Sequence, residues 1–456
     1  MDVSDKMDRK GEIKVPKLDS NCKQRSVTSS RLGRAVQFTS LFAGLTLGTA
    51  SEYTKSLFGW SDATDMQSAM LSPQNMERIV DKLCQLRGAA LKLGQVISMQ
   101  DPKTISPQLI EIFDRVRQSA DYMPDSQVMK IMCDQFGNEW QTKFKAFDDK
   151  PFAAASIGQV HCGILHNDVD VAIKIQYLDI SKSIESDLNN LIGMLRFFNL
   201  FPPGAFIDDV IEKLKRELAW EVDYLREGDF QTKYRDLIVA HHEFYVPKVY
   251  DELTTTCVLT TELVSGITVD KCFELDYEHR QFIGMSLLKL VFIELFEMKC
   301  MQPDSNWSNY LYEQKSKRIM LLDFGASRFY SDEFINNYKE FLRASVADDR
   351  DKLYELLIKM KFLTEDDSEV LVEAHMNAAM MFGEIFRNDG DFDFGEENLS
   401  ERLSVEVAKM IEQRMSPPPE EVYSINRKIS GIVSLCSKLN IKINCRQIYN
   451  EIIERT

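Results

Sequence analysis

The sequence predicts an α+β fold with two lobes, one built around a small sheet and one mostly helical. Three observations support this prediction. The chain has 456 residues, which at about 150 residues per domain allows roughly three domains, or one large two-lobed domain with extensions. Short strand-like runs gather between Phe147 and Val264. Apolar residues at helical spacing prevail before that stretch and again beyond about residue 331.

The composition excludes several functional classes. Lys and Arg number 55 and Asp and Glu number 71, which gives a formal charge of −16. Such a chain lacks the basic footprint of a non-specific nucleic-acid binder, so we expect no nucleic-acid partner. The nine cysteines contain no C-x-x-C pair, which argues against a disulfide framework and against a structural zinc site. A reducing compartment is the better interpretation.

Residues 1–34 are predicted to form a disordered basic arm. They hold nine Lys and Arg against five Asp and Glu, and Pro16 interrupts them. The arm is only weakly similar to a mitochondrial presequence, because such segments avoid acids and this one contains Asp2, Asp5 and Asp8.

Residues 35–60 are predicted to be a glycine-rich, membrane-proximal segment. The apolar run Val36–Ala50 is too short to cross a bilayer unaided, and no run of about 18 consecutive apolar residues occurs in the chain. Gly44 and Gly48 have the G-x-x-x-G spacing that lets helix backbones approach closely in lipid. Membrane association, a homodimer through these glycines and packing within the chain all remain open.

Residues 61–145 are predicted to form a helical extension. Ser72 can cap a helix and Pro73 is tolerated in a first turn, so a helix is expected to begin there. The K-x-G-Q motif Lys92–Gln95 falls inside this helix, where a glycine costs about 1 kcal/mol relative to alanine. A close contact would explain that glycine. The helix has one apolar face, formed by Ile79, Leu83, Leu86, Ala90, Leu93 and Ile97.

Residues 146–265 are predicted to be the smaller lobe, with inserted helices. Small residues at Ala153–Val160 predict a strand, a turn and a second strand, and Val171–Ile175 predicts another strand. Residues 205–236 are predicted to form one long charged helix.

Residues 266–456 are predicted to be the larger, helical lobe and a C-terminal tail. An apolar helix is expected over residues 279–300, and two strand-like runs then end at Leu321–Gly325.

Four pieces that carry chemistry follow one another in these lobes. Small side chains at a turn let backbone N–H groups approach a phosphate, and a lysine on the next strand neutralises the α- and β-phosphates. Amide and carboxylate oxygens suit Mg²⁺, and an aspartate shortly before the asparagine can orient an attacking hydroxyl or water. The pieces are the turn Ala153, Ala154, Ala155, Ser156, Ile157, Gly158, Gln159 and Val160, then Lys174, then Asp304 with Asn309, and finally Asp323.

This order matches the parts of a protein kinase, but with departures. The turn holds one glycine, Gly158, where kinases have a glycine-rich loop. Met301, Gln302 and Pro303 stand before Asp304 in place of H-R-D, and no A-P-E follows the D-F-G sequence.

Several motifs together resemble one family. K-x-G-Q at 92–95, AAASIGQVH at 153–161, E-x-D at 221–223 and LLDFGASR at 321–328 resemble the UbiB-type family of atypical kinases. The sequences QPDSNWSNYLY, LTTELVSG and PPPEEVYSINRKISG are similar to the eukaryotic coenzyme Q biosynthesis kinases of mitochondria. The resemblance covers about residues 28–450 and implies a two-lobed protein-kinase-like fold.

The resemblance implies a regulatory plug over the nucleotide site. Lys92 and Gln95 would lie over that site, with Lys92 facing the acids Glu221 and Asp223. Such a plug would block a peptide substrate from the usual groove.

The resemblance also implies roles in catalysis and nucleotide binding. Lys174 would pair with Glu227, although the residues alone leave Glu217 and Glu212 open. The alanine-rich turn would replace the glycine-rich loop. The hinge that binds adenine through backbone groups would be Glu262, Leu263 and Val264. The catalytic-loop and metal positions would be Asp304, Asn309 and Asp323.

Three functions stay open on this basis. The first is an atypical kinase or ATPase that uses Mg²⁺ and ATP and supports ubiquinone biosynthesis at the matrix face of the mitochondrial inner membrane. The second is a nucleotide-gated scaffold or lipid-handling chaperone with little turnover. The third is a conventional protein kinase, which the missing H-R-D and A-P-E sequences disfavour. The expected partners are ATP and ADP, a cardiolipin-like membrane lipid, quinone-precursor lipids, coenzyme Q biosynthesis proteins and a second copy of the chain.

Overall fold

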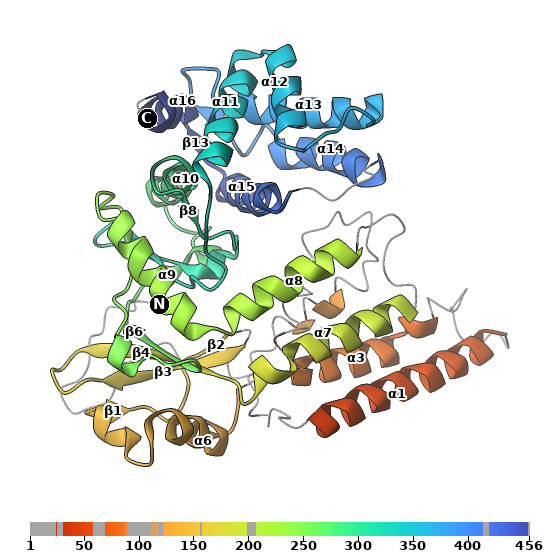
Figure 1. Ribbon diagram of the computed structural model, residues 1–456, viewed down its shortest axis with the longest axis vertical. Helices are drawn as coiled ribbons and strands as arrows, with labels where there is room; N and C mark the ends of the chain where they lie inside the picture. The colour runs from red at the N-terminus through yellow and green to blue at the C-terminus, as the bar shows by residue number, and fades with distance from the viewer. Residues whose placement is uncertain are drawn as a thin grey trace. The chain divides into compact units, whose positions relative to one another are not determined.

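The computed structural model describes residues 24, 31–57, 69–86, 88, 111–113, 115–116, 122–155, 157–197, 207–413 and 419–454. They form an α+β structure, as predicted, and the chain divides into two compact units (Figure 1). The first unit contains Met1–Arg226 and Val249–Leu263, and the second contains Glu227–Lys248 and Val264–Thr456.

The first unit contains an antiparallel sheet with the strand order β1-β3-β4-β6, and β2 also pairs with β3. Buried and half-buried side chains alternate along β4. Val171, Ile173 and Ile175 are buried on one face of the sheet, and the residues between them are half-buried on the other face. The strands are β1 Ala146–Phe147, β2 Ala153–Ala154, β3 Gly158–Ile164, β4 Asp170–Gln176 and β6 Val258–Glu262.

Helices share a hydrophobic core with this sheet. Helix α1 packs on α3 and α7, and α7 packs on α8 (Figure 1). One continuous set of buried apolar side chains joins these helices to β4 and β6. The predicted helix start is confirmed, because α3 begins at Pro73. The helices are α1 Arg31–Leu57, α3 Pro73–Leu86, α6 Asp125–Phe136, α7 Ile180–Phe197 and α8 Ile207–Glu221.

The prediction of one long helix over 205–236 is wrong. Helix α8 ends at Glu221, and a second helix, α9, spans Tyr224–Leu237. The break has a local cause: the Asp223 carboxylate accepts the backbone N–H of Arg226 at 3.1 Å, which caps the start of α9. A capping aspartate therefore interrupts a charge pattern that reads as continuous.

Helix α1 also begins earlier than expected, at Arg31, inside the stretch predicted to be a disordered arm. The rest of that arm lies outside the described residues, apart from Gln24, which forms a single bridge with Tyr122. Among the described helices, none is both long enough and apolar enough to cross a membrane.

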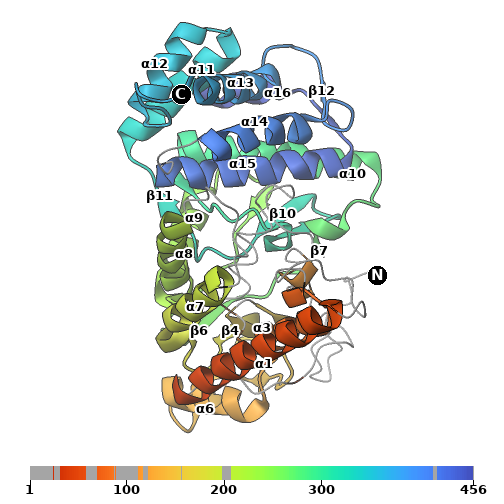
Figure 2. The same cartoon turned by 90° about the vertical axis from the view of Figure 1, so that its right-hand side faces the viewer.

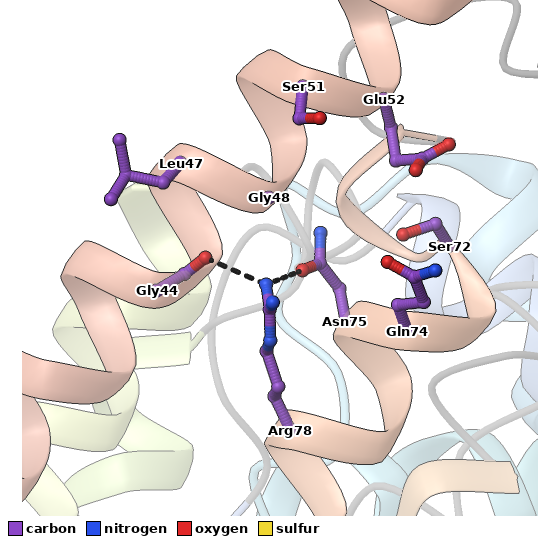
Figure 3. Close-up of a pocket in the computed structure, with 9 residues that line it drawn as sticks. All are labelled: Gly44, Leu47, Gly48, Ser51, Glu52, Ser72, Gln74, Asn75 and Arg78. Atoms are coloured by element: carbon purple, nitrogen blue, oxygen red, sulfur yellow. Dashed lines mark hydrogen bonds between the residues drawn. The ribbon is translucent and has the colours of Figure 1, made fainter.

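The glycine pair of α1 packs against α3 of the same chain (Figure 3). Arg78 donates to the carbonyl oxygen of Gly44 at 3.2 Å and to Asn75 Oδ1 at 3.2 Å. A Cβ added at Gly48 would lie 2.2 Å from Asn75 Oδ1, so this glycine permits the close approach of the two helices. A pocket of about 230 Å³ lies beside this contact, lined by Ser51, Glu52 and Ser72 among others. The sequence left membrane association, a homodimer and packing within the chain open for the G-x-x-x-G spacing. Gly48 takes part in packing within the chain.

The second unit combines a small sheet with a helical bundle. Its sheet has the order β5-β10-β9-β7, in which β5 and β10 are parallel and the other pairs antiparallel. Two further pairs, β8 with β11 and β12 with β13, lie outside that sheet. The strands are β5 Phe244–Tyr245, β7 Ile267–Thr268, β8 Cys300–Met301, β9 Tyr310–Glu313, β10 Arg318–Leu321, β11 Arg328–Phe329, β12 Phe392–Asp393 and β13 Lys442–Ile443.

Helix α15 packs against both α10 and α14 in the bundle (Figure 2). The apolar helix expected over 279–300 is α10, and it continues as a π-helical turn at Ile293–Glu297. Wider turns of this kind often occur at functional sites. The helices are α10 Tyr277–Phe292, α11 Asp332–Ala347, α12 Arg350–Lys359, α13 Glu369–Glu384, α14 Leu399–Gln413, α15 Glu420–Leu439 and α16 Cys445–Tyr449.

Replacing Gly48 by alanine is expected to destabilise the first unit. Asn75 is buried and is held by a hydrogen bond to the carbonyl oxygen of Ala69, so it cannot easily move away from the new methyl group. Overpacking of this kind costs about 1–3 kcal/mol. Gly44→Ala is the matched control on the same helix, because nothing lies within 4 Å of its added Cβ. Chemical denaturation should show a loss for Gly48→Ala and none for Gly44→Ala, and equal stabilities would contradict the packing argument.

Candidate functional site

The alanine-rich turn is a tight hairpin between β2 and β3. Ala153 pairs with Val160, Ala154 pairs with Gln159, and the N–H of Ala155 donates to the carbonyl of Gly158 at 2.8 Å. Side chains of this size leave the backbone open to a ligand, which a phosphate-binding turn requires. Ser156, at the tip, lies outside the described residues.

Only a glycine fits at position 158 of this hairpin. A Cβ added at Gly158 would lie 2.5 Å from the carbonyl oxygen of Ile175 and 2.8 Å from the hydroxyl of Tyr224. The neighbouring Ile157 buries its side chain in the core, and its carbonyl accepts the N–H of Tyr177 at 2.9 Å. These contacts attach the hairpin to β4, to Tyr177 just after it and to Tyr224 at the start of α9.

Both polar atoms of the Gln159 side chain are hydrogen-bonded to other residues of the protein. Its Oε1 accepts the backbone N–H of Met123 at 2.7 Å, and its Nε2 lies 2.9 Å from Nε2 of His161. Gln159 is fully buried, and the nucleotide-binding role predicted for it stays a prediction.

Lys174 lies on the less buried face of β4. Val160 on β3 and Leu259 on β6 are its register partners, so these side chains share one face of the sheet. The ammonium group lies 5.0 Å from the centre of the Tyr224 ring, a cation–π contact that orients the lysine. Lys174 is half-buried, which places a cation at the edge of the apolar core.

The predicted hinge coincides with a boundary between the two units. Glu262 ends β6 opposite Val171, and the N–H of Leu263 donates to the carbonyl of Asp170 at 3.0 Å. Val264 is the first residue of the second unit on this segment.

Two predicted ion contacts remain predictions. Glu227 lies in the first turn of α9 with its side chain buried, in the second unit, whereas Lys174 belongs to the first. Lys92 and Gln95 lie outside the described residues, so the plug on Glu221 and Asp223 rests on the sequence alone. Asp223 has in addition the capping role described above.

Asp304 and Asn309 are in direct contact in the second unit. The amide Nδ2 of Asn309 donates to Asp304 Oδ2 at 3.3 Å, and Asp304 Oδ1 accepts the N–H of Asn306 at 3.1 Å. Because the amide nitrogen is used in this way, the oxygen Oδ1 of Asn309 is the atom left for a ligand.

The β9–β10 hairpin brings Asp323 to the same end as Asn309. Tyr310 pairs with Leu321, and the N–H of Leu322, directly after β10, donates to the carbonyl of Asn309 at 2.9 Å. Asn309 stands directly before β9 and Asp323 just after β10, so antiparallel register places both at one edge.

Asp323 has an unusual backbone conformation. Its φ of 62° lies in the left-handed region, and its Oδ1 accepts the N–H of Gly325 at 3.3 Å. Aspartate tolerates this region through such local hydrogen bonds, and backbone strain of this kind is concentrated at functional sites. Phe324 is buried, with its ring 4.9 Å from that of Tyr234 on α9, which holds the turn in place.

The three side chains offer hard oxygen ligands. Carboxylate and amide oxygens are the donors that Mg²⁺ prefers, and protein sites for it usually use one or two carboxylates with water and phosphate oxygens completing the shell. Over the described residues no group of three or more His, Cys, Asp or Glu is placed to hold a metal ion. Asn309 Oδ1 and the Asp323 carboxylate are oxygen donors of the kind that Mg²⁺ prefers.

A set of residues around this site was missed from the sequence. Arg427 and Lys428 of α15 bond to the backbone of the residues before Asp304, and Lys428 forms a buried ion pair with Glu294. Two basic residues within the apolar pattern of α15 and an acid in V-F-I-E-L-F were the available signals. Neither indicates its partner, because the pairs lie more than a hundred residues apart.

The chain belongs to the ABC1 atypical kinase-like family, whose domain model matches residues 115–357. It is 42% identical over 439 residues to a Danio rerio protein named atypical kinase COQ8B, mitochondrial, covering 96% of this chain and 70% of that one. It is 38% identical over 432 residues to Saccharomyces cerevisiae atypical kinase COQ8, mitochondrial, covering 94% and 86%. The resemblance found in the sequence is thereby confirmed.

A solved structure supports the fold. The complex of Rv3197 with erythromycin from Mycobacterium tuberculosis matches with a TM-score of 0.58 and 22% identity, covering 86% of this chain and 98% of that one. At this identity the likeness concerns the fold alone. Together with the family match, it confirms the predicted kinase-like α+β fold.

The stability of the first unit is expected to fall on acidification through His161. Burial lowers the pKa of this imidazole, although the carbonyl of Asp148 and the charges of Asp148, Asp149 and Asp125 oppose the shift. Gln159 donates to Nε2, so protonation there would place two donors face to face. In the unfolded chain the pKa of His161 has its ordinary value of about 6.5, so below that pH the unfolded chain binds more protons than the folded protein. The stabilising contribution of His161 is therefore complete above about pH 6.5. It decreases below that pH, by at most about 1.4 kcal/mol per pH unit.

The measurement is the thermal midpoint between pH 7.5 and about 5, a range that spans the unperturbed histidine pKa. His161→Gln should flatten the decrease. His166 on the exposed β3–β4 turn provides the control, and its replacement by Gln should leave the decrease unchanged. A decrease of the same size in His161→Gln would show that other groups cause it.

Proposed function

We propose that the chain is an atypical kinase-fold enzyme that binds Mg²⁺ and ATP and hydrolyses ATP or transfers its γ-phosphoryl group. The observation that carries the proposal is the contact of Asp304 with Asn309, together with the hairpin register that places Asp323 at the same edge. Family membership and the relatives named mitochondrial atypical kinases support it.

Each catalytic residue has a role that follows from its position. Asp304 accepts a hydrogen bond from the attacking hydroxyl or water and orients it, and Asn309 holds the Asp304 carboxylate in place. Asn309 Oδ1 and the Asp323 carboxylate would hold Mg²⁺, which neutralises charge on the phosphate oxygens.

The hairpin of β2 and β3 and Lys174 are the proposed phosphate-binding residues. Backbone N–H groups of the hairpin Ala153–Val160 bind phosphate oxygens, and Lys174 adds a positive charge that its cation–π contact keeps oriented. Glu227, as the partner of Lys174, would fix the lysine further. Glu262, Leu263 and Val264 would bind adenine through backbone groups, and Lys92, Gln95, Glu221 and Asp223 would form the plug.

We further propose that the activity supports ubiquinone biosynthesis at the matrix side of the mitochondrial inner membrane. The names of the relatives support the mitochondrial location. Helix α1 exposes the large apolar side chains Val36, Phe42 and Leu47, which suits contact with a cardiolipin-containing surface or a quinone-precursor lipid. The proposed boundaries are a basic arm over 1–34, a membrane-proximal segment over 35–60, a helical extension over 61–145 and lobes over 146–265 and 266–456. They differ from the observed elements in that α1 begins at Arg31 and Glu227–Lys248 groups with the second unit.

A nucleotide-gated scaffold is the second candidate, and the same exposed apolar residues of α1 favour it. In that case nucleotide binding would change the affinity for lipid or for coenzyme Q biosynthesis proteins, with little turnover. A conventional protein kinase acting on peptides is disfavoured by the absence of H-R-D and A-P-E sequences.

Asp323→Asn and Lys174→His are expected to abolish phosphate release that depends on Mg²⁺ and ATP. Asp323→Asn removes a negative charge from the proposed Mg²⁺ ligands. Lys174→His replaces the long, positively charged side chain proposed to bind phosphate with a shorter one. Asp348→Asn is the matched control, because Asp348 also has a left-handed backbone, with φ 61°, but ends α11.

The assay measures phosphate release and nucleotide-induced thermal shift, with and without cardiolipin-containing liposomes. We expect lipid-stimulated phosphate release in the wild type and in Asp348→Asn, and no release in Asp323→Asn or Lys174→His. Stabilisation by nucleotide without release would favour the scaffold. Full turnover in both site variants would overturn the proposed mechanism.

A further inference from the structure

Helix α15, near the C-terminal end of the chain, is bonded directly to the loop that carries Asp304. Lys428 Nζ donates to the carbonyl oxygen of Gln302 at 2.8 Å, and Arg427 Nε donates to that of Pro303 at 3.1 Å. On the other side of Asp304, the indole N–H of Trp307 donates to the carbonyl of Gly431 at 3.1 Å. The two residues before the aspartate and the third residue after it are thus attached to one helix.

Both backbone groups of Gln302, its carbonyl and its N–H, are hydrogen-bonded to the side chains of Lys428 and Glu294. Its carbonyl accepts from Lys428, and its N–H donates to Glu294 Oε1 at 3.0 Å. Lys428 and Glu294 also pair with each other, with Nζ and Oε2 3.3 Å apart. The peptide groups on both sides of one loop residue are therefore held by the two halves of one ion pair.

This ion pair is fully buried. The side chains of Lys428 and Glu294 are 1% and 0% exposed. Two tyrosine hydroxyls complete the network: Tyr234 donates to Glu294 at 2.9 Å, and Lys428 donates to Tyr310 at 2.8 Å. Tyr310 follows Asn309 directly, so the network contacts both the loop of Asp304 and the start of β9.

Stability alone gives a weak reason for such a pair. Removing two charges from water costs about as much as their attraction returns, and well-packed apolar residues often serve as well or better. What apolar residues cannot supply is a donor to the Gln302 carbonyl and an acceptor for its N–H. Burial raises the pKa of Glu294, although Lys428 and the hydrogen-bond donors around the carboxylate oppose the shift. The raised pKa shows that burying the charged carboxylate is unfavourable.

A glycine completes the contact. A Cβ added at Gly431 would lie 2.3 Å from Cβ of Ser305, the residue next to Asp304. The backbone of α15 can therefore approach the loop only because this position has no side chain. All of these α15 residues lie beyond 357, where the match to the family's domain model ends.

We propose that Lys428, paired with Glu294, is a positioning residue that sets the location of Asp304 through the backbone of Gln302. The inference rests on the proposed function, since it concerns how the catalytic aspartate is held. Lys428 is buried against Gln302, Glu294 and Tyr310, so the proposal assigns it no contact with the nucleotide or the reacting atoms. Its effect is to keep the Asp304 carboxylate within range of the attacking group.

The first variants are Lys428→Met and the uncharged double variant Lys428→Met/Glu294→Gln. Lys428→Met leaves a buried acid without its partner, so its thermal midpoint should fall. In the double variant no charge is left unpaired, and the amide oxygen introduced by Glu294→Gln remains an acceptor for the Gln302 N–H, so the midpoint should recover. In both, kcat should fall about a hundredfold, the loss expected from a misplacement of roughly 1 Å.

The separation of kcat from KM identifies positioning. Because Lys174 and the alanine-rich hairpin are untouched, the KM for ATP and the thermal shift with ADP should stay near their wild-type values. A merely structural role predicts that kcat recovers together with the midpoint in the double variant, and that result would overturn the proposal. Unchanged kcat in folded Lys428→Met would do the same.

Gly431→Ala supplies a test that removes no charge and no hydrogen-bonding group. The new methyl group should displace Ser305 and lower kcat while leaving the thermal shift with ADP intact. Gly193→Ala is the matched control, since Gly193 lies in helix α7 with nothing within 4 Å of its added Cβ, and it should keep the wild-type kcat. Wild-type kcat in Gly431→Ala would overturn the proposal even if the Lys428 variants fail to fold. A wild-type protein without turnover would instead overturn the proposed function.

Discussion

The buried contact between Lys428 and Glu294 connects the loop of Asp304 to the rest of the second unit. Around it meet α9 through Tyr234, the π-helical turn through Glu294 itself, the Asp304 loop through Gln302 and strand β9 through Tyr310. A buried ion pair is favourable only when further hydrogen bonds reach its remaining donors and acceptors, as those with Tyr234, Gln302 and Tyr310 do here. That requirement ties elements far apart in the sequence to one arrangement.

A second constraint shapes the sheet of the first unit. The hairpin of β2 and β3 must lie close to β4, and Gly158 has no room for a side chain beside Ile175 and Tyr224. Tyr224 in turn lies under the ammonium group of Lys174. The same tyrosine therefore limits the turn and orients the lysine, so the two parts that bind phosphate in our proposal are mechanically linked.

Glycines mark the close contacts in both units, and each has a different neighbour. Gly48 brings α1 onto Asn75 of α3, and Gly431 brings α15 onto Ser305 beside Asp304. Where nothing opposes a glycine, as at Gly44, its absence of a side chain has no packing consequence. A G-x-x-x-G spacing alone does not distinguish these cases.

The sequence by itself determined the α+β class, the start of α3 at Pro73, the strand that carries Lys174 and the family. These follow from local periodicity and from short motifs, which need no knowledge of distant neighbours. It placed Asp304, Asn309 and Asp323 in order but did not show which atoms meet. The tertiary structure added the hydrogen bond from Asn309 to Asp304 and the β9–β10 register, which places Asp323 at the same edge as Asn309.

Only the tertiary structure decided the break between α8 and α9, the use of Gly48 within the chain and the role of α15. The first depends on one capping hydrogen bond, which the Asp223 carboxylate accepts from the N–H of Arg226 and which interrupts an otherwise continuous helical pattern. The others depend on which side chains face each other across more than twenty and more than a hundred residues. Periodicity records which face of a helix is buried, but not what it is buried against, because that is set by the packing of the whole unit.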